Sequence, residues 1–496
     1  MRRKKLIVVG GGTAGWMAAC AVAKQLPYLD VTLLESPAIP PVGVGEGSTP
    51  HFKRFMALLG IDESVWMPAC GATYKNGIFF RNWNGKQDQY FHPFYCKDDV
   101  KPAEVFFYLA NQRRRGMPID VDICDYFITG HLVRQHKAPV SQQKAINTEY
   151  GYHFSADRLA AFLKVIALGL GVTHKLGMVD RVTLVPEGDA VASLILHDGQ
   201  RLEADLFIDA SGFQSILLGK ALKVPFIPFS DQLLTNRAVT LATKQTPPFT
   251  FTDSIAMNAG WRWRIPLQDR IGNGYVYADA FISPEQAEQE LISELGENVV
   301  DGSIRHLSFT AGMRQKTWVG NVLGIGLAQS FVEPLEATSL MVTQLCIEFF
   351  IHHMHSQGGT LQDKQQQLNQ QVSSLLAGIK DYIVCHYVTS QRTDTQFWQQ
   401  ASQVNKGRVL EEIMHTWRVG QDVDEVLHTR DKELAYFRPS WYAILNGMDY
   451  HADNTATPGD ALPMSLLDQA KRYNQHLCEE NFISQEKLLL EFTRTH

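Results

Sequence analysis

The chain has 496 residues, 45% hydrophobic and 20% charged, a balance typical of a globular protein with more than one structural unit. Its net charge of −6 gives no reason to expect nucleic acid or an anionic membrane as a partner. No apolar run reaches the length of a membrane span, and seven scattered cysteines without a CxxC pair indicate reduced thiols, so we expect a cytoplasmic protein without a metal site.

The strongest local signal lies at the N-terminus. A short apolar strand runs into GGGTAGW, where Gly10, Gly12 and Gly15 fit G-x-G-x-x-G, and a helix and a second strand ending at Glu35 follow. Gly10 allows the tight turn, Gly12 the approach of a pyrophosphate, and Gly15 close packing of helix on strand. Glu35 can accept hydrogen bonds from a ribose diol. The pattern predicts a dinucleotide site, with NAD and FAD both open at this point.

Later segments repeat the design of a strand followed by a turn of small residues. A helix is expected over residues 152–171 with Ser155 as its N-cap, and a strand and a hairpin follow it. The run LFIDASG (206–212) then returns toward a parallel sheet, and residues 321–340 repeat strand, glycine-bearing turn and helix. Units so far apart in the chain resemble the α/β FAD-binding fold of the hydroxylase-like flavoproteins, the GR2 type, rather than a compact NAD dehydrogenase.

Long connections separate these units. One of them contains GWRWRIPL (260–267), whose alternation predicts a half-buried strand with Trp261 and Trp263 on one face. We expect one integrated protein in which an inserted sheet and a C-terminal helical region bind a flat aromatic substrate. The FAD-binding module is expected to comprise residues 1–90, 150–215 and 300–370. The substrate-binding module is expected to comprise residues 91–149, 216–299 and 371–496.

Five motifs together resemble the flavin-dependent halogenases, best known as tryptophan halogenases. They are GGGTAGW at 10–16, GVGEGSTP at 43–50, TYKNG at 73–77, GWRWRIPL at 260–267 and FVEPLEATS at 331–339. They follow the family's order and span nearly the whole chain. The resemblance implies an enzyme that receives FADH2 from a separate flavin reductase and uses O2 to oxidise bound chloride or bromide to hypohalous acid. That oxidant would pass through an internal tunnel to indole or a tryptophan-like compound.

The resemblance also implies roles for particular residues. Lys75 and Glu336 match the catalytic lysine and glutamate: Lys75 acts either as an amine that forms a haloamine or as an ammonium that donates a hydrogen bond, and Glu336 takes the ring proton. The halide is expected at the backbone N–H groups of Thr338 and Ser339. Ala337 stands where many relatives have serine, which leaves its effect on activity and halide preference open.

The other implied site residues form three groups. The residues expected to bind FAD are Gly10, Gly12, Thr13, Ala14, Gly15, Glu35, Val44, Gly45, Glu46, Asp209 and Gly326. The expected tunnel wall consists of Trp261, Trp263 and Pro266. The aromatic substrate is expected to contact His92, Phe94, Trp441 and Tyr442. Residues 37–49 resemble a strap that covers the isoalloxazine, and Gly47 should make that strap more mobile.

Two other functions stay open on the sequence. A flavin-dependent aromatic monooxygenase would share the fold but need no halide, and a non-catalytic flavin-binding protein is compatible with Ala337. We expect a pocket that accepts indole or another electron-rich aromatic rather than one dedicated to free tryptophan. The sequence does not decide the ring position attacked, the choice between chloride and bromide, or whether the chain forms a homodimer.

Overall fold

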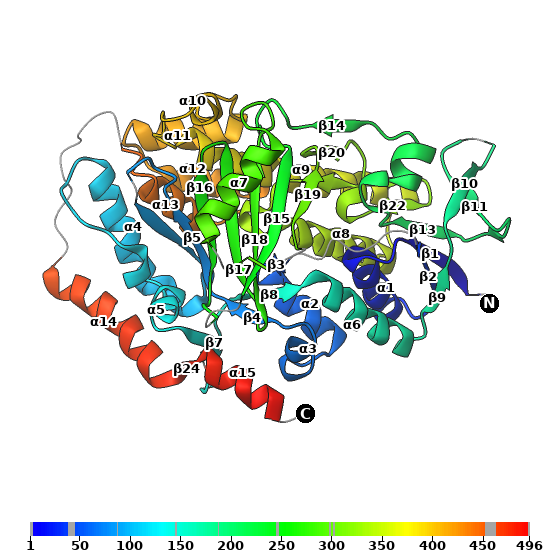
Figure 1. Cartoon of the computed structure of the whole chain (residues 1–496), viewed down its shortest axis with the longest axis horizontal. Helices are drawn as coiled ribbons and strands as arrows, with labels where there is room; N and C mark the ends of the chain where they lie inside the picture. The colour runs from blue at the N-terminus through cyan, green and yellow to red at the C-terminus, as the bar shows by residue number, and fades with distance from the viewer. Residues whose placement is uncertain are drawn as a thin grey trace.

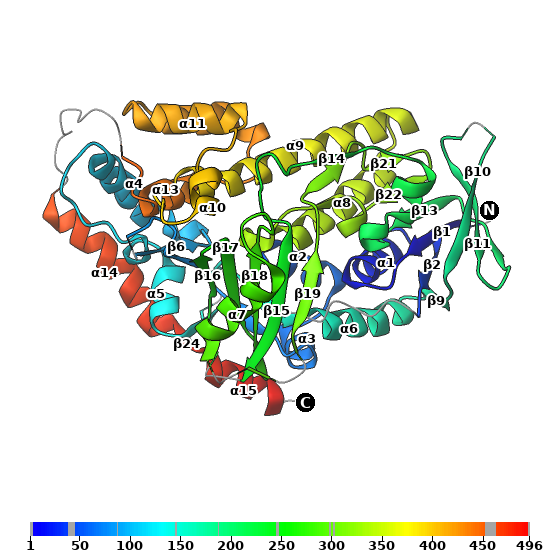
Figure 2. The ribbon, with the colours of Figure 1, turned by 45° about the horizontal axis from the view of Figure 1, so that its top comes forward.

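Two large sheets organise the chain (Figure 1). The computed structural model describes residues 3–37, 45–86, 88–143, 146–186, 188–244, 248–296, 299–300, 303–451 and 463–494. A six-stranded sheet lies at one end of the molecule with α1, and a seven-stranded sheet lies at the centre. Figure 2 shows the long helix α9 (Leu361–Val388) running along the top from above the seven-stranded sheet toward β21 and β22.

The six-stranded sheet carries the N-terminal glycine motif. Its order is β21-β22-β13-β1-β2-β9, and all neighbours are parallel except β21 and β22. The strands are β21 (Trp318–Val319), β22 (Val322–Gly324), β13 (Leu206–Asp209), β1 (Lys4–Val9), β2 (Leu29–Glu35) and β9 (Thr173–Leu176). The predicted first strand and the return of LFIDASG to a parallel sheet are confirmed. A run such as LIVV suits a strand that is covered on both faces.

Helix α1 packs on this sheet, and two further helices pack on α1. Helix α1 (Thr13–Gln25) contacts α6 (Ala156–Gly169) and α8 (Thr338–His355). The helix predicted over residues 152–171 begins later than expected, because Gly151–Ser155 form strand β8 and pair with β3 and β4. Ser155 does stand at the N-cap position, but its hydroxyl donates to Asp157 and makes no cap bond. Long-range pairing overrides the local helix signal here.

The seven-stranded sheet contains the tryptophan-rich segment and has the order β19-β15-β18-β17-β16-β5-β6. Its strands are β19 (Arg305–Ser308), β15 (Arg237–Lys244), β18 (Arg270–Tyr277), β17 (Gly260–Pro266), β16 (Thr252–Met257), β5 (Gly77–Arg81) and β6 (Gln89–Pro93). The strand prediction for GWRWRIPL is confirmed, but β17 is central and buried on both faces rather than half-buried. Helix α7 (Pro284–Leu295) packs on β15 and β18.

A small antiparallel sheet connects the two large ones. Strand β8 pairs on one side with β3 (Gly45–Gly47) and on the other with β4 (Thr73–Lys75). Further short sheets are formed by β10 (Val179–Leu184), β11 (Val191–Leu196) and β12 (Arg201–Leu202); by β14 (Phe226–Pro228), β20 (Gly312–Arg314) and β23 (Ser330–Phe331); and by β7 (Lys137–Ser141) with β24 (Phe482–Ser484). The β10–β12 strands confirm the predicted hairpin after α6.

Helices dominate the rest of the chain, as the pattern of residues 371–496 predicts. The remaining helices are α2 (His51–Leu59), α3 (Glu63–Ala69), α4 (Val100–Arg114), α5 (Ile128–Arg134), α10 (Gln396–Ala401), α11 (Arg408–Arg418), α12 (Val423–Thr429), α13 (Arg438–Gly447), α14 (Met464–Asn481) and α15 (Gln485–Arg494). One hydrophobic cluster extends from the strands of the N-terminal motif to these C-terminal helices. The two sheets therefore share a continuous core.

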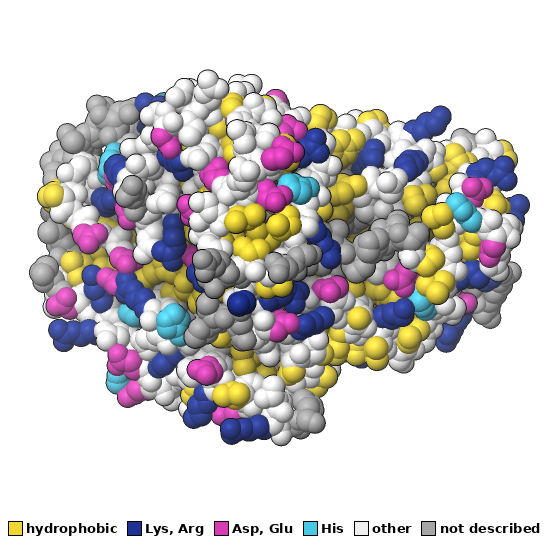
Figure 3. All heavy atoms as spheres, viewed as in Figure 1, with side chains coloured by type: hydrophobic (Ala, Val, Ile, Leu, Met, Phe, Trp, Pro, Cys, Tyr) yellow, Lys and Arg dark blue, Asp and Glu magenta, His cyan; other side chains and the backbone are white. Residues whose placement is uncertain are grey.

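The surface and the thiols add few functional signals. On the face in Figure 3, basic and acidic side chains are interspersed rather than gathered by sign. All seven cysteines are free and buried. Within the described ranges, no helix is long and apolar enough to cross a membrane, and no group of His, Cys, Asp or Glu side chains is placed to hold a metal ion.

Candidate active site and flavin site

The glycine turn after β1 is built on close backbone contacts. Gly10 has a φ of 126°, and a Cβ there would lie 2.2 Å from the carbonyl oxygen of Ala210. A Cβ on Gly15 would lie 1.9 Å from the carbonyl oxygen of Gly10, so α1 can approach β1 only with glycine at this position. A Cβ on Gly12 would meet nothing within 4 Å. The open space beside Gly12, at the uncapped start of α1, fits the pyrophosphate of a dinucleotide.

Glu35 ends β2 and faces this turn. A Cβ on Gly11 would lie 2.5 Å from Cδ of Glu35, so the carboxylate lies directly over the glycines. Its Oε2 accepts a hydrogen bond from Nε2 of His174 at 2.7 Å, and Nζ of Lys164 lies 3.5 Å away. These two basic residues orient the carboxylate beside the site expected for the adenosine ribose.

Asp209 is held by its own chain. Its Oδ2 accepts hydrogen bonds from the backbone N–H groups of Leu217 and Leu218, both at 2.8 Å, and Oδ1 accepts from Ser211. Burial raises the pKa of the carboxyl, while these donors lower it. In this structure Asp209 fixes the turn that follows β13, and its direct contact with FAD stays a prediction.

The other residues expected to bind FAD lie around the N-terminus of α1. Gly326 has a φ of 57°, and a Cβ there would lie 2.9 Å from Cβ of Ala14, so the turn after β22 meets the start of α1. The hydroxyl of Thr13 donates to the carbonyl oxygen of Ala156 on α6. The structure thus brings together the turns that follow β1 and β22, which is the edge where a parallel sheet binds its ligand.

The expected strap is described only in part. Val44 lies outside the described residues, whereas Gly45 and Glu46 form β3. A Cβ on Gly45 would lie 3.2 Å from Cγ2 of Ile265, so the strap rests on the end of β17. Burial, together with the nearby carboxylate of Asp157, raises the pKa of Glu46 to about 7. A protonated Glu46 can donate a hydrogen bond near neutral pH.

Lys75 ends β4 with its amine buried. Among the described residues its Nζ has no hydrogen-bond partner, and it lies 5.6 Å from the ring centroid of Phe94. A Cβ on Gly47 would lie 3.4 Å from this Nζ and 3.7 Å from Cβ of Ala337. The end of the strap at Gly47 therefore lies directly beside the amine and the turn at Ala337. Burial lowers the pKa of Lys75 to about 8, against the opposing effect of Glu336.

Glu336 is presented by a strained turn and held by two histidines. It closes the 3₁₀ turn Pro334–Glu336, and Ala337 then takes a left-handed conformation with a φ of 56°, which costs a non-glycine residue about 1 kcal/mol. Nδ1 of His92 lies 2.9 Å from Oε2, and Nε2 of His386 lies 3.3 Å from Oε1. Burial alone would raise the pKa of Glu336, but the two histidines lower it to about 2.

The residues expected to bind halide start α8. Thr338 and Ser339 are its first two residues, and Ala337 at the N-cap has no side chain that could bond to their N–H groups. The Oγ1 of Thr338 is buried and has no partner among the described residues, while the Ser339 hydroxyl contacts the carbonyl oxygen of Val332 at 3.4 Å. Free amides at the start of a long helix suit an anion.

The two tryptophans of β17 differ in how they are held. Nε1 of Trp261 donates to Oε2 of Glu333 at 2.7 Å, and the same oxygen accepts from the hydroxyl of Tyr387 at 2.6 Å. The Trp263 ring lies against Gly274 of β18, where a Cβ would come within 2.0 Å of it. The two ring centroids are 6.1 Å apart, as expected for side chains on one face of a strand.

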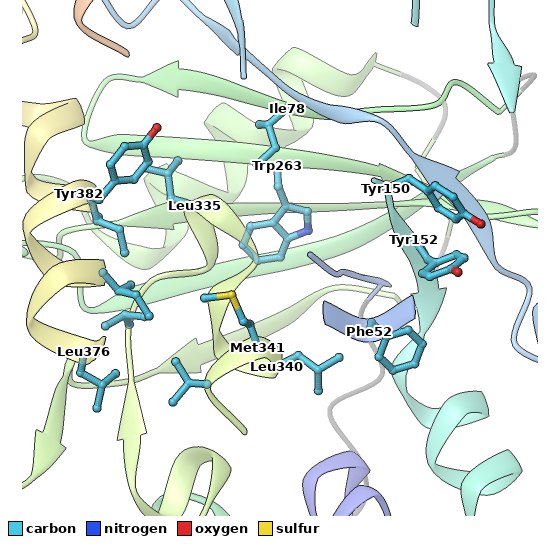
Figure 4. Close-up of a cluster of buried hydrophobic side chains, with 14 of the residues drawn as sticks. Phe52, Ile78, Tyr150, Tyr152, Trp263, Leu335, Leu340, Met341, Leu376 and Tyr382 are labelled. Atoms are coloured by element: carbon cyan, nitrogen blue, oxygen red, sulfur yellow. The ribbon is translucent and has the colours of Figure 1, made fainter. Parts of the chain in front are cut away.

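Figure 4 shows the Trp263 indole between Ile78 of β5 and Met341 of α8. This places the indole between the central sheet and the helix that starts at the expected halide site. Pro266, at the end of β17, accepts a hydrogen bond on its carbonyl oxygen from the hydroxyl of Thr73 at 2.7 Å. The strand of Lys75 and the expected wall are therefore tied together directly.

Two of the four residues expected to contact substrate, His92 and Phe94, lie beside Glu336 and Lys75, and a third, Trp441, packs on Tyr382. Nδ1 of His92 contacts the Glu336 carboxylate and Nε2 contacts the hydroxyl of Ser440, so both ring nitrogens have polar partners. Phe94 lies over the lysine amine, and the Trp441 ring meets the Tyr382 ring edge-on at 5.1 Å.

Tyr442 points elsewhere. Its ring packs on Phe107 at 4.8 Å and Trp417 at 5.3 Å, and its hydroxyl accepts from Asn111. Successive residues of a helix differ in direction by about 100°, so α13 cannot present both Trp441 and Tyr442 to one site. The structure does not bring Tyr442 to Glu336, and its expected contact with substrate has no geometric support.

Sequence reasoning missed several residues that surround Glu336. They are Tyr90, Tyr382, His386, Tyr436, Ser440 and, one turn earlier, Glu333. Burial first and then the Glu336 charge raise the pKa values of the three tyrosines, which keeps them neutral. The four-residue spacing of Tyr382 and His386 on a helical pattern was a usable signal, because it puts both on one helix face.

Comparisons with known proteins cover nearly the whole chain. The family model described as tryptophan halogenase matches residues 5–464. A tryptophan 6-halogenase from Streptomyces albogriseolus is 32% identical over 94% of this chain and 93% of its own length. A tryptophan 7-halogenase from Lentzea aerocolonigenes is 31% identical over 90% and 89%, respectively.

Solved structures agree with these relatives. A flavin-dependent halogenase from Xanthomonas campestris superimposes with a TM-score of 0.89 and 30% identity, covering 99% of both chains. A flavin-dependent halogenase from Brevundimonas sp. BAL3 gives a TM-score of 0.86 and 29% identity, again over 99% of both chains. The predicted α/β flavoprotein fold with an inserted sheet and a helical C-terminal region is confirmed by this likeness.

Proposed function

Because the chain belongs to the tryptophan halogenase family of flavin-dependent enzymes, we propose that it uses FADH2 and O2 to transfer chloride or bromide to an electron-rich aromatic ring. The observation that carries this proposal is a buried lysine amine, without a hydrogen-bond partner among the described residues, that lies close enough to the buried Glu336 to be influenced by its charge. Lys75 and Glu336 come from distant parts of the chain, and the Glu336 charge raises the pKa of Lys75 against the effect of burial. Paired groups with shifted pKa values in an apolar pocket are typical of acid–base sites.

The FAD site fits the residues that surround it. Gly10, Gly12 and Gly15 leave room for a pyrophosphate at the start of α1, and Glu35 lies where a ribose would bind. Reduced FAD, when bound, supplies two electrons, and the halide supplies two more. Together they reduce O2, which gives hypohalous acid and water. The strands of this sheet come from residues 1–90, 150–215 and 300–370, which supports an interleaved FAD module. Two strands within those ranges, β5 (Gly77–Arg81) and β19 (Arg305–Ser308), pair instead in the seven-stranded sheet, so the expected module boundaries do not follow the sheets throughout.

The N-terminus of α8 holds the halide in this proposal. Thr338 and Ser339 offer backbone N–H groups, and Ala337 preserves the turn although it lacks a serine hydroxyl. Trp261 and Trp263 fill the space behind this turn and keep the organic substrate away from the flavin. Glu333 anchors the Trp261 end of that wall through a 2.7 Å hydrogen bond.

Lys75 receives the oxidant and aims it at the ring. A new bond forms between halogen and a ring carbon, and Glu336 takes the ring proton, so that arene and hypohalous acid give aryl halide and water. The carboxylate is ready for this task because His92 and His386 keep its pKa at about 2 despite burial.

An indole or another electron-rich aromatic is the substrate class we propose. Phe94, Trp441, Tyr382 and Tyr436 supply flat apolar surfaces near Lys75 and Glu336, and the centroids of the Tyr382 and Tyr436 rings lie 3.8 Å apart. Aromatic walls favour flat rings. The relatives named above act on tryptophan, so free tryptophan is the first competitor to measure.

The deciding experiment supplies FADH2, O2 and either halide to the purified protein with a panel of indole, tryptophan and phenols. Halogenated product that disappears when halide is omitted supports the proposal. Oxygenated product without halide would favour an aromatic monooxygenase, and flavin binding without any product would favour a non-catalytic protein. Lys75→Ala should abolish aryl halogenation yet still halogenate a small, freely diffusing acceptor, whereas Lys432→Ala, on an exposed lysine, should behave as wild type.

We also propose the partner and location that the family resemblance implies. A separate flavin reductase would deliver FADH2, and adding such an enzyme with NADH should replace chemically reduced flavin in the assay. Seven free, buried cysteines support a cytoplasmic location. A homodimer remains a prediction, which light scattering of the purified protein will check.

A further inference from the structure

His386 is the residue near Glu336 whose protonation state the proposed reaction leaves open. It lies in the last turn of α9 and is fully buried, with its ring 4.7 Å from Phe80 and 5.2 Å from Tyr382. Its Nε2 lies 3.3 Å from Oε1 of Glu336. This is an ion-pair distance rather than an aligned hydrogen bond, so charge matters more here than geometry.

The other ring nitrogen fixes where the proton must be. Nδ1 of His386 lies 3.0 Å from the backbone carbonyl oxygen of Tyr382, which can only accept a hydrogen bond. Nδ1 therefore carries a hydrogen. A neutral imidazole would then place the unprotonated Nε2 3.3 Å from Oε1 of Glu336, with two acceptors close together in a buried site. A second proton between Nε2 and Oε1 removes this conflict.

His92 does not need that extra proton. Its Nδ1 contacts both oxygens of Glu336 at 2.9 and 3.0 Å, while Nε2 lies 2.8 Å from the hydroxyl of Ser440. A hydroxyl can donate as well as accept, so a neutral His92 with its hydrogen on Nδ1 satisfies both contacts. His92 can thus make its contacts as a neutral ring, whereas His386 needs a proton on both ring nitrogens, although both histidines contact the same carboxylate.

The end of α9 favours the charged form of His386. The helix has 28 residues, and its C-terminus presents the negative end of its dipole. Charge balance points the same way: an imidazolium at His386 neutralises Glu336, and the buried cluster then carries no net charge if Lys75 is an amine.

We infer that His386 is a positioning residue that carries the proton balancing the Glu336 carboxylate, so that Lys75 is free to react as a neutral amine. The consequence for Lys75 rests on the proposed function. The amine takes the halogen from hypohalous acid and releases water. The nitrogen–halogen bond then breaks as the ring carbon takes the halogen, and the ring proton returns to the nitrogen through Glu336. The titratable groups around this pair are Lys75, Tyr90, His92, Tyr382, Cys385 and Tyr436.

Nitrogen NMR of the resting protein tests the proton assignment without turnover. With ¹⁵N-histidine, Nε2 and Nδ1 of His386 should both resonate as N–H nitrogens of an imidazolium at pH 7. Glu336→Gln should convert them to a neutral ring, and His386→Gln assigns the signals. A neutral His386 in the wild type would overturn the inference. Should His386→Gln fail to fold, His92→Gln assigns the other histidine in contact with Glu336, and the remaining signals that change in Glu336→Gln belong to His386. A protein that never halogenates can still be tested in this way.

The pH dependence of the organic step tests the consequence for Lys75. With a lysine pKa of about 8, the amine fraction and the single-turnover rate should rise about fivefold from pH 7 to pH 8. In His386→Gln, Lys75 becomes the counter-ion of Glu336, so the rate should fall about tenfold at pH 7 for each unit of pKa gained and recover at higher pH. The control His353→Gln removes a buried histidine on α8 and should keep the wild-type profile. Coincident profiles for His386→Gln and wild type would refute the inference.

Discussion

Replacing Lys75 by methionine should make the protein more stable at neutral pH. Lys75 is fully buried, and its amine has no hydrogen-bond partner among the described residues. Methionine is unbranched and apolar, so it fills nearly the same space without a charge. The substitution removes a group that the proposed function requires and stability does not, a trade-off that is common at active sites.

The size of the effect follows from the change in pKa on folding. Burial lowers the pKa of Lys75 from 10.5 to about 8, and each unit is worth about 1.4 kcal/mol. The charged form therefore destabilises the folded state by about 3 kcal/mol below pH 8. Between about pH 8 and pH 10.5 the unfolded chain binds more protons than the folded one, so wild-type stability rises with pH and the penalty disappears above 10.5.

Urea unfolding of the flavin-free protein, followed by tryptophan fluorescence, measures this difference. Lys75→Met should exceed the wild type by about 3 kcal/mol at pH 7, and the gap should close as the pH approaches 10.5. Lys432→Met replaces an exposed lysine and should change stability by no more than about 0.5 kcal/mol at either pH. If Lys75→Met were no more stable than wild type at pH 7, the amine would not be a desolvated charge and the argument for its shifted pKa would fail.

Three further outcomes can be measured. Gly15→Ala should unfold at lower urea concentration because its Cβ meets the Gly10 carbonyl oxygen. Gly12→Ala, with open space around it, should keep wild-type stability but bind FAD more weakly in a flavin-fluorescence titration. The same loss of stability in both variants would contradict the assigned roles. Glu336→Gln should slow aryl halogenation by about 10²–10⁴-fold in rapid-quench assays without weakening FAD binding; a small loss would exclude Glu336 as proton acceptor. Trp261→Phe should cost about 1–3 kcal/mol in urea unfolding, since Glu333 loses a buried donor; unchanged stability would show that water replaces the indole N–H.

Local sequence patterns determined the scaffold. The apolar run before Gly10, the glycine spacing and the acid at Glu35 predicted a strand, a turn, a helix and a second strand, because each depends on residues close together in the chain. The alternation in GWRWRIPL predicted β17 for the same reason. The motifs matched across the chain also identified the family, and the site roles carried with them stay predictions.

Only the tertiary structure decided how the site is assembled. The sequence alone could not reveal that His386 and His92 hold Glu336, that Glu333 anchors Trp261, or that Tyr442 turns away toward α4 and α11. The sequence pattern also predicted a helix for residues 152–155, whereas pairing with β3 and β4 makes these residues a strand. These features depend on contacts between residues far apart in the chain, and the burial and charge that set each pKa arise only when those contacts form.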